Sequence, residues 1–176
     1  DSLGDYELRA APPMNRIRLR QVLQTNFYPN FFAVDTPQPD SGEALDYVRF
    51  PDGTWDYDEA GTIDYRNTND ESRAQAVQRF LQYAADRLHE AGVYVSADVF
   101  GECAEKYVTA YGQYWAAISG VVDAISAMPY PDHYSASGSW LPWEHPYETM
   151  KTFGEKAAAR QQETPSPAAV RTWIQC

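Results

Sequence analysis

The stretch ESRAQAVQRFLQYAADRLHEAGVYVSADVFG, residues 71–101, predicts a helix that is followed directly by a buried strand. Asn69, Asp70 or Ser72 can cap the helix, because short polar side chains accept hydrogen bonds from its first free N–H groups. Apolar residues then recur at helical spacing until EAG ends the pattern. The residues of this apolar face are Ala76, Phe80, Leu81, Ala84 and Leu88. The segment VYVSADVFG is short and apolar and closes on Gly101, as expected of a buried strand.

A second strand is expected upstream, in EALDYVRF at residues 43–50, and it breaks at Pro51 and Gly53. Two strands joined by a long helix form a βαβ unit, which requires parallel pairing and a right-handed crossover. The pattern then repeats, with a helix at 110–121, a strand at 122–130, a helix at 147–162 and a last strand at 170–175.

Four strands that alternate with three helices predict an α/β fold. A complete (β/α)8 TIM barrel typically needs about 250 residues, so we expect an incomplete, C-terminal portion of such a barrel over residues 43–176. An open sheet is the alternative. Residues 1–42 contain proline-rich breaks around a possible short helix at Ile17–Gln24, and we expect them to form an irregular N-terminal segment.

The charge balance limits the partners of the chain. Fourteen basic and 25 acidic residues give a formal net charge of -11, which argues against nucleic acid. No apolar run approaches the roughly 20 residues that a membrane helix needs, so no membrane partner is expected. The compartment stays open, and an extracellular or cell-envelope location is compatible with the sequence.

Polar residues follow the predicted strands at their carboxyl ends, which meet on one face of a parallel sheet. The first strand supplies Asp46, Tyr47 and Arg49, and the second supplies Ser96 and Asp98. The third is followed by Tyr130, His133 and Tyr134, and the fourth ends at Gln175. These residues are therefore the candidates for a shared site.

Asp46 and Asp98 end neighbouring strands, which lie about 4.8 Å apart in a parallel sheet. Two carboxyl groups at such a spacing can act as acid and nucleophile, or as acid and base, on a glycosidic bond. Arg49 can keep one of them ionised while the other stays protonated. Each residue also has a structural interpretation, since Asp46 can pair with Arg49 and Asp98 can cap the next turn.

Other chemistries lack support in the sequence. No glycine fingerprint for a dinucleotide and no Gly-x-Ser-x-Gly elbow is present, and no cofactor is expected. The three histidines and two cysteines have no metal-ligand spacing, so no metal is expected. Cys103 is a weak candidate for a nucleophile, because no activating histidine lies near it in the sequence.

Several motifs in order resemble a known family. LDYVRFPDG (45–53), the opening stretch 71–101, GQYWAAISGVVDAISAMPYPDHYSASG (112–138), HPYETM (145–150) and RTWIQ (171–175) resemble a bacterial family of "putative glycosyl hydrolase" domains. That family is distantly related to the alpha-amylase clan of TIM barrels, and the resemblance covers about residues 44–176. The chain departs from it in DTPQPDSGEA before the first motif and in Ser126 and Ala127, where the family has serine and proline.

The resemblance implies a (β/α)8 barrel that acts on or binds carbohydrate. It places Asp46 at the position of the nucleophile and makes Asp98 the candidate acid/base. The residues expected to contact the sugar are Tyr47, Arg49, Gln113, Tyr130, His133, Tyr134, Trp140 and Gln175. The departures from the family pattern are compatible with a fragment of a longer protein and with a degenerate copy. We expect another chain or a missing N-terminal half to complete the barrel.

Two functions from other classes remain open. In a non-catalytic carbohydrate-binding or scaffold module, the acidic pair is structural and aromatic loops that contain Trp55 and Trp140 hold the glycan. In an interaction subunit of a larger complex, the proline-rich N-terminus and the exposed aromatics pack against other chains.

Overall fold

The protein is described by a computed structural model that covers residues 42–51, 61 and 64–175. These residues form a parallel sheet of four strands in the order β1-β2-β3-β4. The strands are β1 (Gly42–Leu45), β2 (Tyr94–Phe100), β3 (Ala124–Met128) and β4 (Ala169–Thr172). The sheet confirms the α/β fold class, and β1 and β4 are its two open edges, so a closed barrel is not what the described residues form. The segment 1–41 and its expected helix lie outside them.

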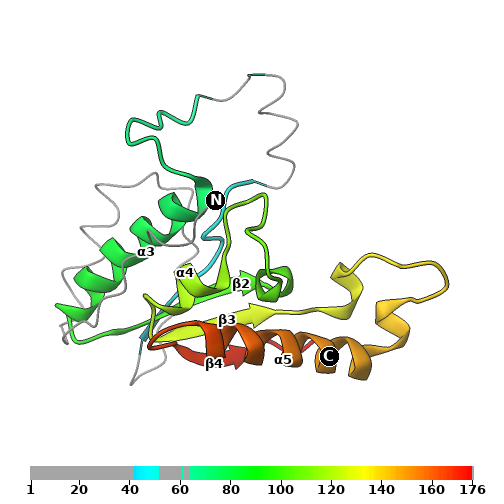
Figure 1. Ribbon diagram of the computed structural model, residues 1–176. Helices are drawn as coiled ribbons and strands as arrows, with labels where there is room; N and C mark the ends of the chain where they lie inside the picture. Colours follow the sequence, from blue (N-terminus) through cyan, green and yellow to red (C-terminus); the bar gives the residue numbers. More distant parts are fainter. Residues whose placement is uncertain (1–41, 52–60, 62–63, 176) are drawn as a thin grey trace.

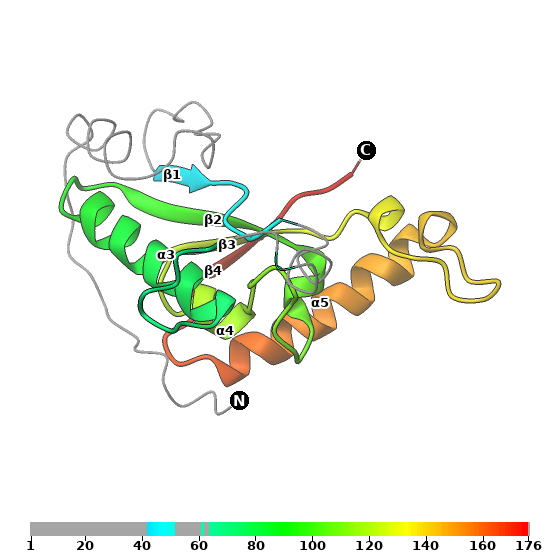
Figure 2. The same cartoon turned by 90° about the horizontal axis from the view of Figure 1, so that it is seen from above.

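All three long connections place their helices on one face of the sheet. The helices are α3 (Arg73–His89), α4 (Trp115–Ser119) and α5 (Pro146–Glu163), and Figure 2 shows them on the same side of the strands. One-sided winding with a sequential strand order is the arrangement that successive right-handed βαβ units produce. The opposite face of the sheet carries no helix from the described parts of the chain.

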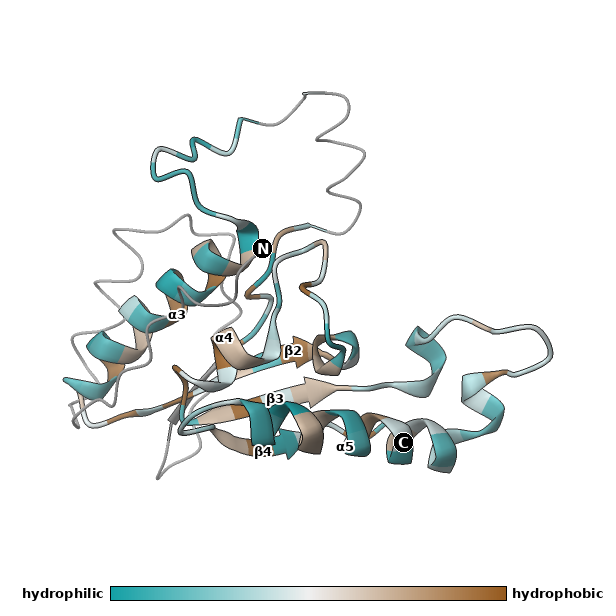
Figure 3. Cartoon of the chain, viewed as in Figure 1, coloured by the Kyte–Doolittle hydropathy of each residue, from teal (hydrophilic) through white to brown (hydrophobic). Residues whose placement is uncertain are grey.

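The hydrophobic core lies between the sheet and these helices. Val95, Ala97 and Val99 of β2 alternate into it and are at most 1% exposed, and Ile125 and Ala127 of β3 do the same. Figure 3 shows hydrophobic colour in β2 and along one stripe of α3. Because successive side chains of a strand point to opposite faces, the residues between these apolar positions must face away from the core.

Helix α3 begins with a capping box. Ser72 Oγ accepts a hydrogen bond from Gln75 N at 3.3 Å, and Gln75 Oε1 accepts one from Ser72 N at 2.9 Å. Of the three predicted caps, Ser72 is the one used. The buried stripe is shifted slightly from the predicted one, because Ala74 and Val77 are buried whereas Ala76 and Phe80 are half-buried. Within the described residues, no helix has both the length and the apolar character required to span a bilayer.

Strand β1 is shorter than the predicted 43–50. It ends at Leu45, and Tyr47 has a φ of 54°, a left-handed conformation that an extended strand does not contain. The backbone turns there, with Arg49 N donating to Tyr47 O at 2.8 Å. The prediction that Arg49 lies on this strand is therefore wrong, and Arg49 follows the turn.

The helix predicted at 110–121 is reduced to the five residues of α4. Gly112 has a φ of 85°, and Gln113 is held outside the helix by its own side chain. Gln113 Oε1 accepts from Phe100 N at 2.9 Å, and its Nε2 donates to Val48 O at 3.3 Å. The buried amide thus connects the end of β2 to the segment after β1.

We expect Gln113→Ala to lower the free energy of unfolding by about 1–3 kcal/mol, because it leaves the Phe100 N–H and the Val48 carbonyl without this partner. Urea denaturation measures the loss. Gln82→Ala is the matched control. The Gln82 amide is partly buried and donates to Asp86 within α3, so it connects no distant segments. Equal losses in the two variants would contradict the connecting role of Gln113.

Candidate functional site

Asp98 lies on the helix-free face of β2. Its neighbours Ala97 and Val99 point into the core, so Asp98 and Ser96 point the other way. Ser96 Oγ and Ser126 Oγ of the adjacent strand are 2.8 Å apart and share a hydrogen bond. Asp98 is 7% exposed, and its Oδ1 accepts a hydrogen bond from Trp173 Nε1 at 3.2 Å. A polar patch therefore occupies the centre of this face.

Asp46 lies beside Asp98 because the two strands are parallel and in register. Leu45 pairs with Ala97, and the next position along each chain is an aspartate. Adjacent strands are about 4.8 Å apart. Asp46 is half-buried, and its Oδ1 accepts from Tyr47 N at 2.7 Å. The register and the effect of the Asp46 charge on Asp98 thus place the two predicted carboxylates near each other.

The pKa of Asp98 is raised above its ordinary value. Burial is the largest cause, because removal from water disfavours the charged carboxylate, and the negative charge of Asp46 raises the pKa further. The hydrogen bonds from Trp173 and Ser126 and the charge of Arg171 lower it in part. Asp98 is therefore the carboxyl group of this patch whose environment favours a bound proton.

Tyr130 shares this environment. Burial raises the pKa of its hydroxyl, and the charges of Asp98 and then Asp46 raise it further. Its ring contacts His133 edge to face, with 5.3 Å between the ring centroids. His133 itself is largely exposed and lies 3.8 Å from Asp132. The loop after β3 thus places Tyr130 near the carboxylates and His133 at the solvent side of Tyr130.

Arg49 is surrounded by aromatic rings. Its guanidinium carbon is 4.7 Å from the ring centroid of Phe100 and 5.5 Å from that of Tyr47. Such contacts favour a cation through the negative ring faces. The residue that lowers the pKa of Asp98 through its positive charge is Arg171, a role that sequence reasoning gave to Arg49.

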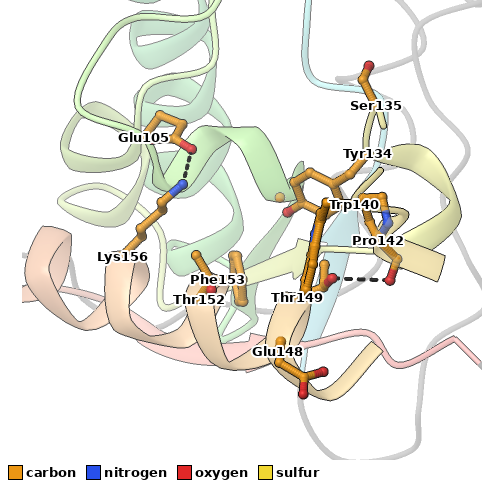
Figure 4. Close-up of a pocket in the computed structure, with 11 residues that line it drawn as sticks. Glu105, Tyr134, Ser135, Trp140, Pro142, Glu148, Thr149, Thr152, Phe153 and Lys156 are labelled. Atoms are coloured by element: carbon orange, nitrogen blue, oxygen red, sulfur yellow. Dashed lines mark hydrogen bonds and ion pairs between the residues drawn. The ribbon is translucent and has the colours of Figure 1, made fainter. Parts of the chain in front are cut away.

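The structure places the other predicted sugar contacts elsewhere. Gln113 is 1% exposed and bonded to two backbone groups, so it is left out of the proposed sugar site. Gln175 is exposed beyond the end of β4. Tyr134 and Trp140 line a separate cavity of about 290 Å³ between the loop after β3 and α5 (Figure 4).

Sequence reasoning missed Arg171, Trp173 and Ser126. Ser126 pairs with Arg171 in the β3–β4 register, and Trp173 follows Arg171 by two residues. The alternation in RTWIQ is the signal that could have found them, because residues two apart on a strand share a face. The alternation alone does not say which residues of β3 lie beside Arg171 and Trp173, because the sequence does not show the β3–β4 register.

No group of three or more His, Cys, Asp and Glu side chains within the described residues is arranged to hold a metal ion. Cys103 is fully buried, and burial raises the pKa of its thiol above the ordinary range. A buried thiol that resists ionisation is a poor nucleophile.

A family model described as "putative glycosyl hydrolase domain" matches residues 43–176. No curated protein and no solved structure matches the chain.

We expect Asp98→Asn to raise the free energy of unfolding at pH 7 by about 0.5–2 kcal/mol. The raised pKa means that the folded state binds this proton more tightly than the unfolded chain does, so stability falls as pH rises from the ordinary value of 3.8 through the raised pKa. Thermal unfolding at several pH values tests this. The decline should flatten in Asp98→Asn and persist in Asp132→Asn, whose carboxyl group is half exposed; identical profiles for all proteins would show that burial does not perturb Asp98.

We expect Trp173→Phe to raise the pKa of Asp98 further, because a hydrogen bond to the charged form is lost while an aromatic ring remains. An NMR titration of the Asp98 carboxyl carbon measures the shift directly. Trp143→Phe, at another exposed tryptophan, should leave the titration unchanged. A Trp173→Phe protein that titrates like the wild type would rule out this hydrogen bond as a determinant.

Proposed function

The chain belongs to the family described as "putative glycosyl hydrolase domain", and on that premise we propose that it hydrolyses glycosidic bonds of an oligosaccharide or polysaccharide through Asp46 and Asp98. The observation that carries the proposal is the in-register placement of the two carboxylates on the helix-free face, with Asp98 buried and its pKa raised.

Asp98 acts as the general acid. A carboxyl group that keeps its proton near neutral pH can protonate the oxygen of the leaving sugar, and burial together with the charge of Asp46 favours that state. The hydrogen bond from Trp173 Nε1 holds one carboxyl oxygen and so fixes the orientation of the group. Arg171 and Ser126 limit the rise in pKa, so that the proton can also be released.

Asp46 acts as the nucleophile. As the leaving oxygen takes the proton of Asp98, an Asp46 oxygen bonds to the anomeric carbon and the glycosidic bond breaks. Water then attacks the glycosyl-enzyme, and Asp98 takes the proton of that water. Retention requires carboxyl groups about 5–5.5 Å apart. Neighbouring strands about 4.8 Å apart favour this outcome over inversion, which needs a wider gap.

Tyr47, Tyr130 and Arg49 border this pair in the proposed site. Tyr47 follows Asp46 directly and is 59% exposed, and Tyr130 is close enough to both carboxylates for their charges to raise its pKa. Flat amphipathic rings suit the apolar faces of sugars. His133 and Gln175, both exposed, extend the proposed contacts toward solvent.

The fold proposed for the whole catalytic unit is a (β/α)8 barrel. A sequential strand order with helices on one face agrees with a barrel segment, whereas a doubly wound sheet reverses its strand order and covers both faces. The polar helix-free face would then line the interior of the barrel. Further strands, from this polypeptide or another chain, would pair with the β1 and β4 edges.

A non-catalytic carbohydrate-binding module is the second candidate. The observation that favours it is the low exposure of Asp98, since the Trp173 indole bonds to the carboxyl group that a substrate would have to reach. In such a module the two carboxylates are structural, and sugar is bound without turnover.

We expect Asp46→Asn and Asp98→Asn each to reduce the release of reducing ends from a panel of polysaccharides by at least about a hundredfold. Asp132→Asn is the control, because its carboxyl group lies in the turn after β3 and is half exposed. Circular dichroism confirms that each variant is folded. Retained hydrolysis in Asp46→Asn would refute the mechanism, and sugar binding without any wild-type hydrolysis would establish the second candidate.

A further inference from the structure

The cavity between the loop after β3 and α5 has an aromatic wall and a charged wall. Figure 4 shows Trp140 and Tyr134 on one side and the ion pair of Glu105 with Lys156 on the other, with Thr152 and Phe153 of α5 between them. We infer that this cavity binds one ring of a neutral sugar, at a site separate from Asp46 and Asp98.

Trp140 is held in place from two sides. Its backbone exchanges two hydrogen bonds of 3.0 Å with Ser137 across a tight turn in which Gly138 has a φ of 60°. Its indole stacks on the His145 ring, with 4.0 Å between the centroids and an angle of 10°. The residue nevertheless remains 41% exposed. An exposed aromatic ring with a fixed orientation loses little entropy when a ligand stacks on it.

The charged wall suits sugar hydroxyl groups. Glu105 lies just after the 3-10 turn that follows β2, and Lys156 lies on α5, so the pair joins two elements across the cavity. A hydroxyl group both donates and accepts hydrogen bonds, and vicinal hydroxyls can therefore donate to the carboxylate and accept from the ammonium. Such charge-assisted hydrogen bonds are stronger than neutral ones.

Tyr134 adds a hydroxyl donor to the same cavity. Burial, followed by the charges of Glu105 and Glu102, raises its pKa to about 12, so it stays protonated at neutral pH. Its approach depends on Gly101, because a Cβ atom at that position would lie 2.1 Å from the Tyr134 hydroxyl oxygen. The glycine at the end of β2 thus leaves the space that the tyrosine occupies.

The cavity favours a small, neutral ligand. Lys156 balances Glu105, and Glu148 adds a further negative charge at the rim, so an acidic sugar is repelled. Its volume of about 290 Å³ lies just below the range for drug-sized ligand pockets, about 300–1,000 Å³. A single monosaccharide unit of a longer chain is the ligand that fits both conditions.

Neither Asp46 nor Asp98 lines this cavity, and the two tyrosines of the loop after β3 agree with that separation. The charges that act on Tyr134 are those of Glu105 and Glu102, whereas those that act on Tyr130 are Asp98 and Asp46. Two tyrosines of one loop, four positions apart, therefore lie in two different environments. The sugar site does not depend on hydrolysis, and it applies to the catalytic and the non-catalytic candidate functions alike.

The test compares Trp140→Ala with Trp143→Ala in the full chain. Trp143 is 46% exposed and lies three residues away, but it does not line the cavity. The probes are cellotetraose, maltotetraose and trigalacturonate, and binding is measured by ligand-observed NMR and calorimetry. We expect a neutral tetrasaccharide to bind the wild type, at least a fivefold weaker affinity in Trp140→Ala, and unchanged affinity in Trp143→Ala.

Three outcomes would overturn the inference. They are the absence of binding by both neutral probes, equal affinities in Trp140→Ala and the wild type, and tighter binding of trigalacturonate than of either neutral probe. Asp46→Asn separates this site from the proposed hydrolysis, because it should retain neutral-sugar binding while losing turnover. Loss of binding in Asp46→Asn as large as in Trp140→Ala would show that the two sites are one, whereas retained turnover in that variant would refute the hydrolytic mechanism alone.

Discussion

The parallel pairing of β2 with β1 and β3 is the constraint on which both sites depend. It places Leu45 beside Ala97 and Ser126 beside Asp98, so that apolar residues of three strands meet the helices while polar residues meet one another on the opposite face. A shift of one residue would exchange the two faces and bury the carboxylates in the hydrophobic core. The buried Gln113 amide, bonded to Phe100 and Val48, stabilises this register at the end of β2.

At Asp98, the proposed role as general acid and the stability of the fold oppose one another. A carboxyl group that is 7% exposed is unfavourable when charged, and the nearby charge of Asp46 adds to that cost. The structure offsets it only in part, through Trp173, Ser126 and Arg171. A purely structural residue at this position would be expected to be apolar or fully paired. Partial compensation is the condition that a general acid requires, because a fully stabilised carboxylate would not hold a proton near neutral pH.

The sequence allowed the alternation of strands and helices, the Ser72 cap and the candidate carboxylates to be predicted, because hydrophobic periodicity and capping act locally. It did not reveal the early end of β1, since β-prone residues continue to Phe50. The segment after the Tyr47 turn bonds instead to distant residues, Val48 O to Gln113 and Phe50 N to Tyr111. The short α4 has a similar cause, because Gln113 bonds to segments distant in the chain. Arg171 and Trp173 were missed because their proximity to Asp98 follows from the β3–β4 register, which is a long-range property.

The end of β2 links the carboxylate patch to the sugar cavity. Asp98 points to the helix-free face, and three residues later Gly101 lines the cavity beneath the Tyr134 hydroxyl. Gly101 is the first residue of the 3-10 turn that follows β2, so the end of this strand lies next to both environments. The loop after β3 makes the same division with Tyr130 and Tyr134. A glycan long enough to reach both the carboxylate patch and the sugar cavity would pass over the end of β2. The fixed Trp140 ring would then determine which glycosidic bond of that glycan lies near Asp46 and Asp98.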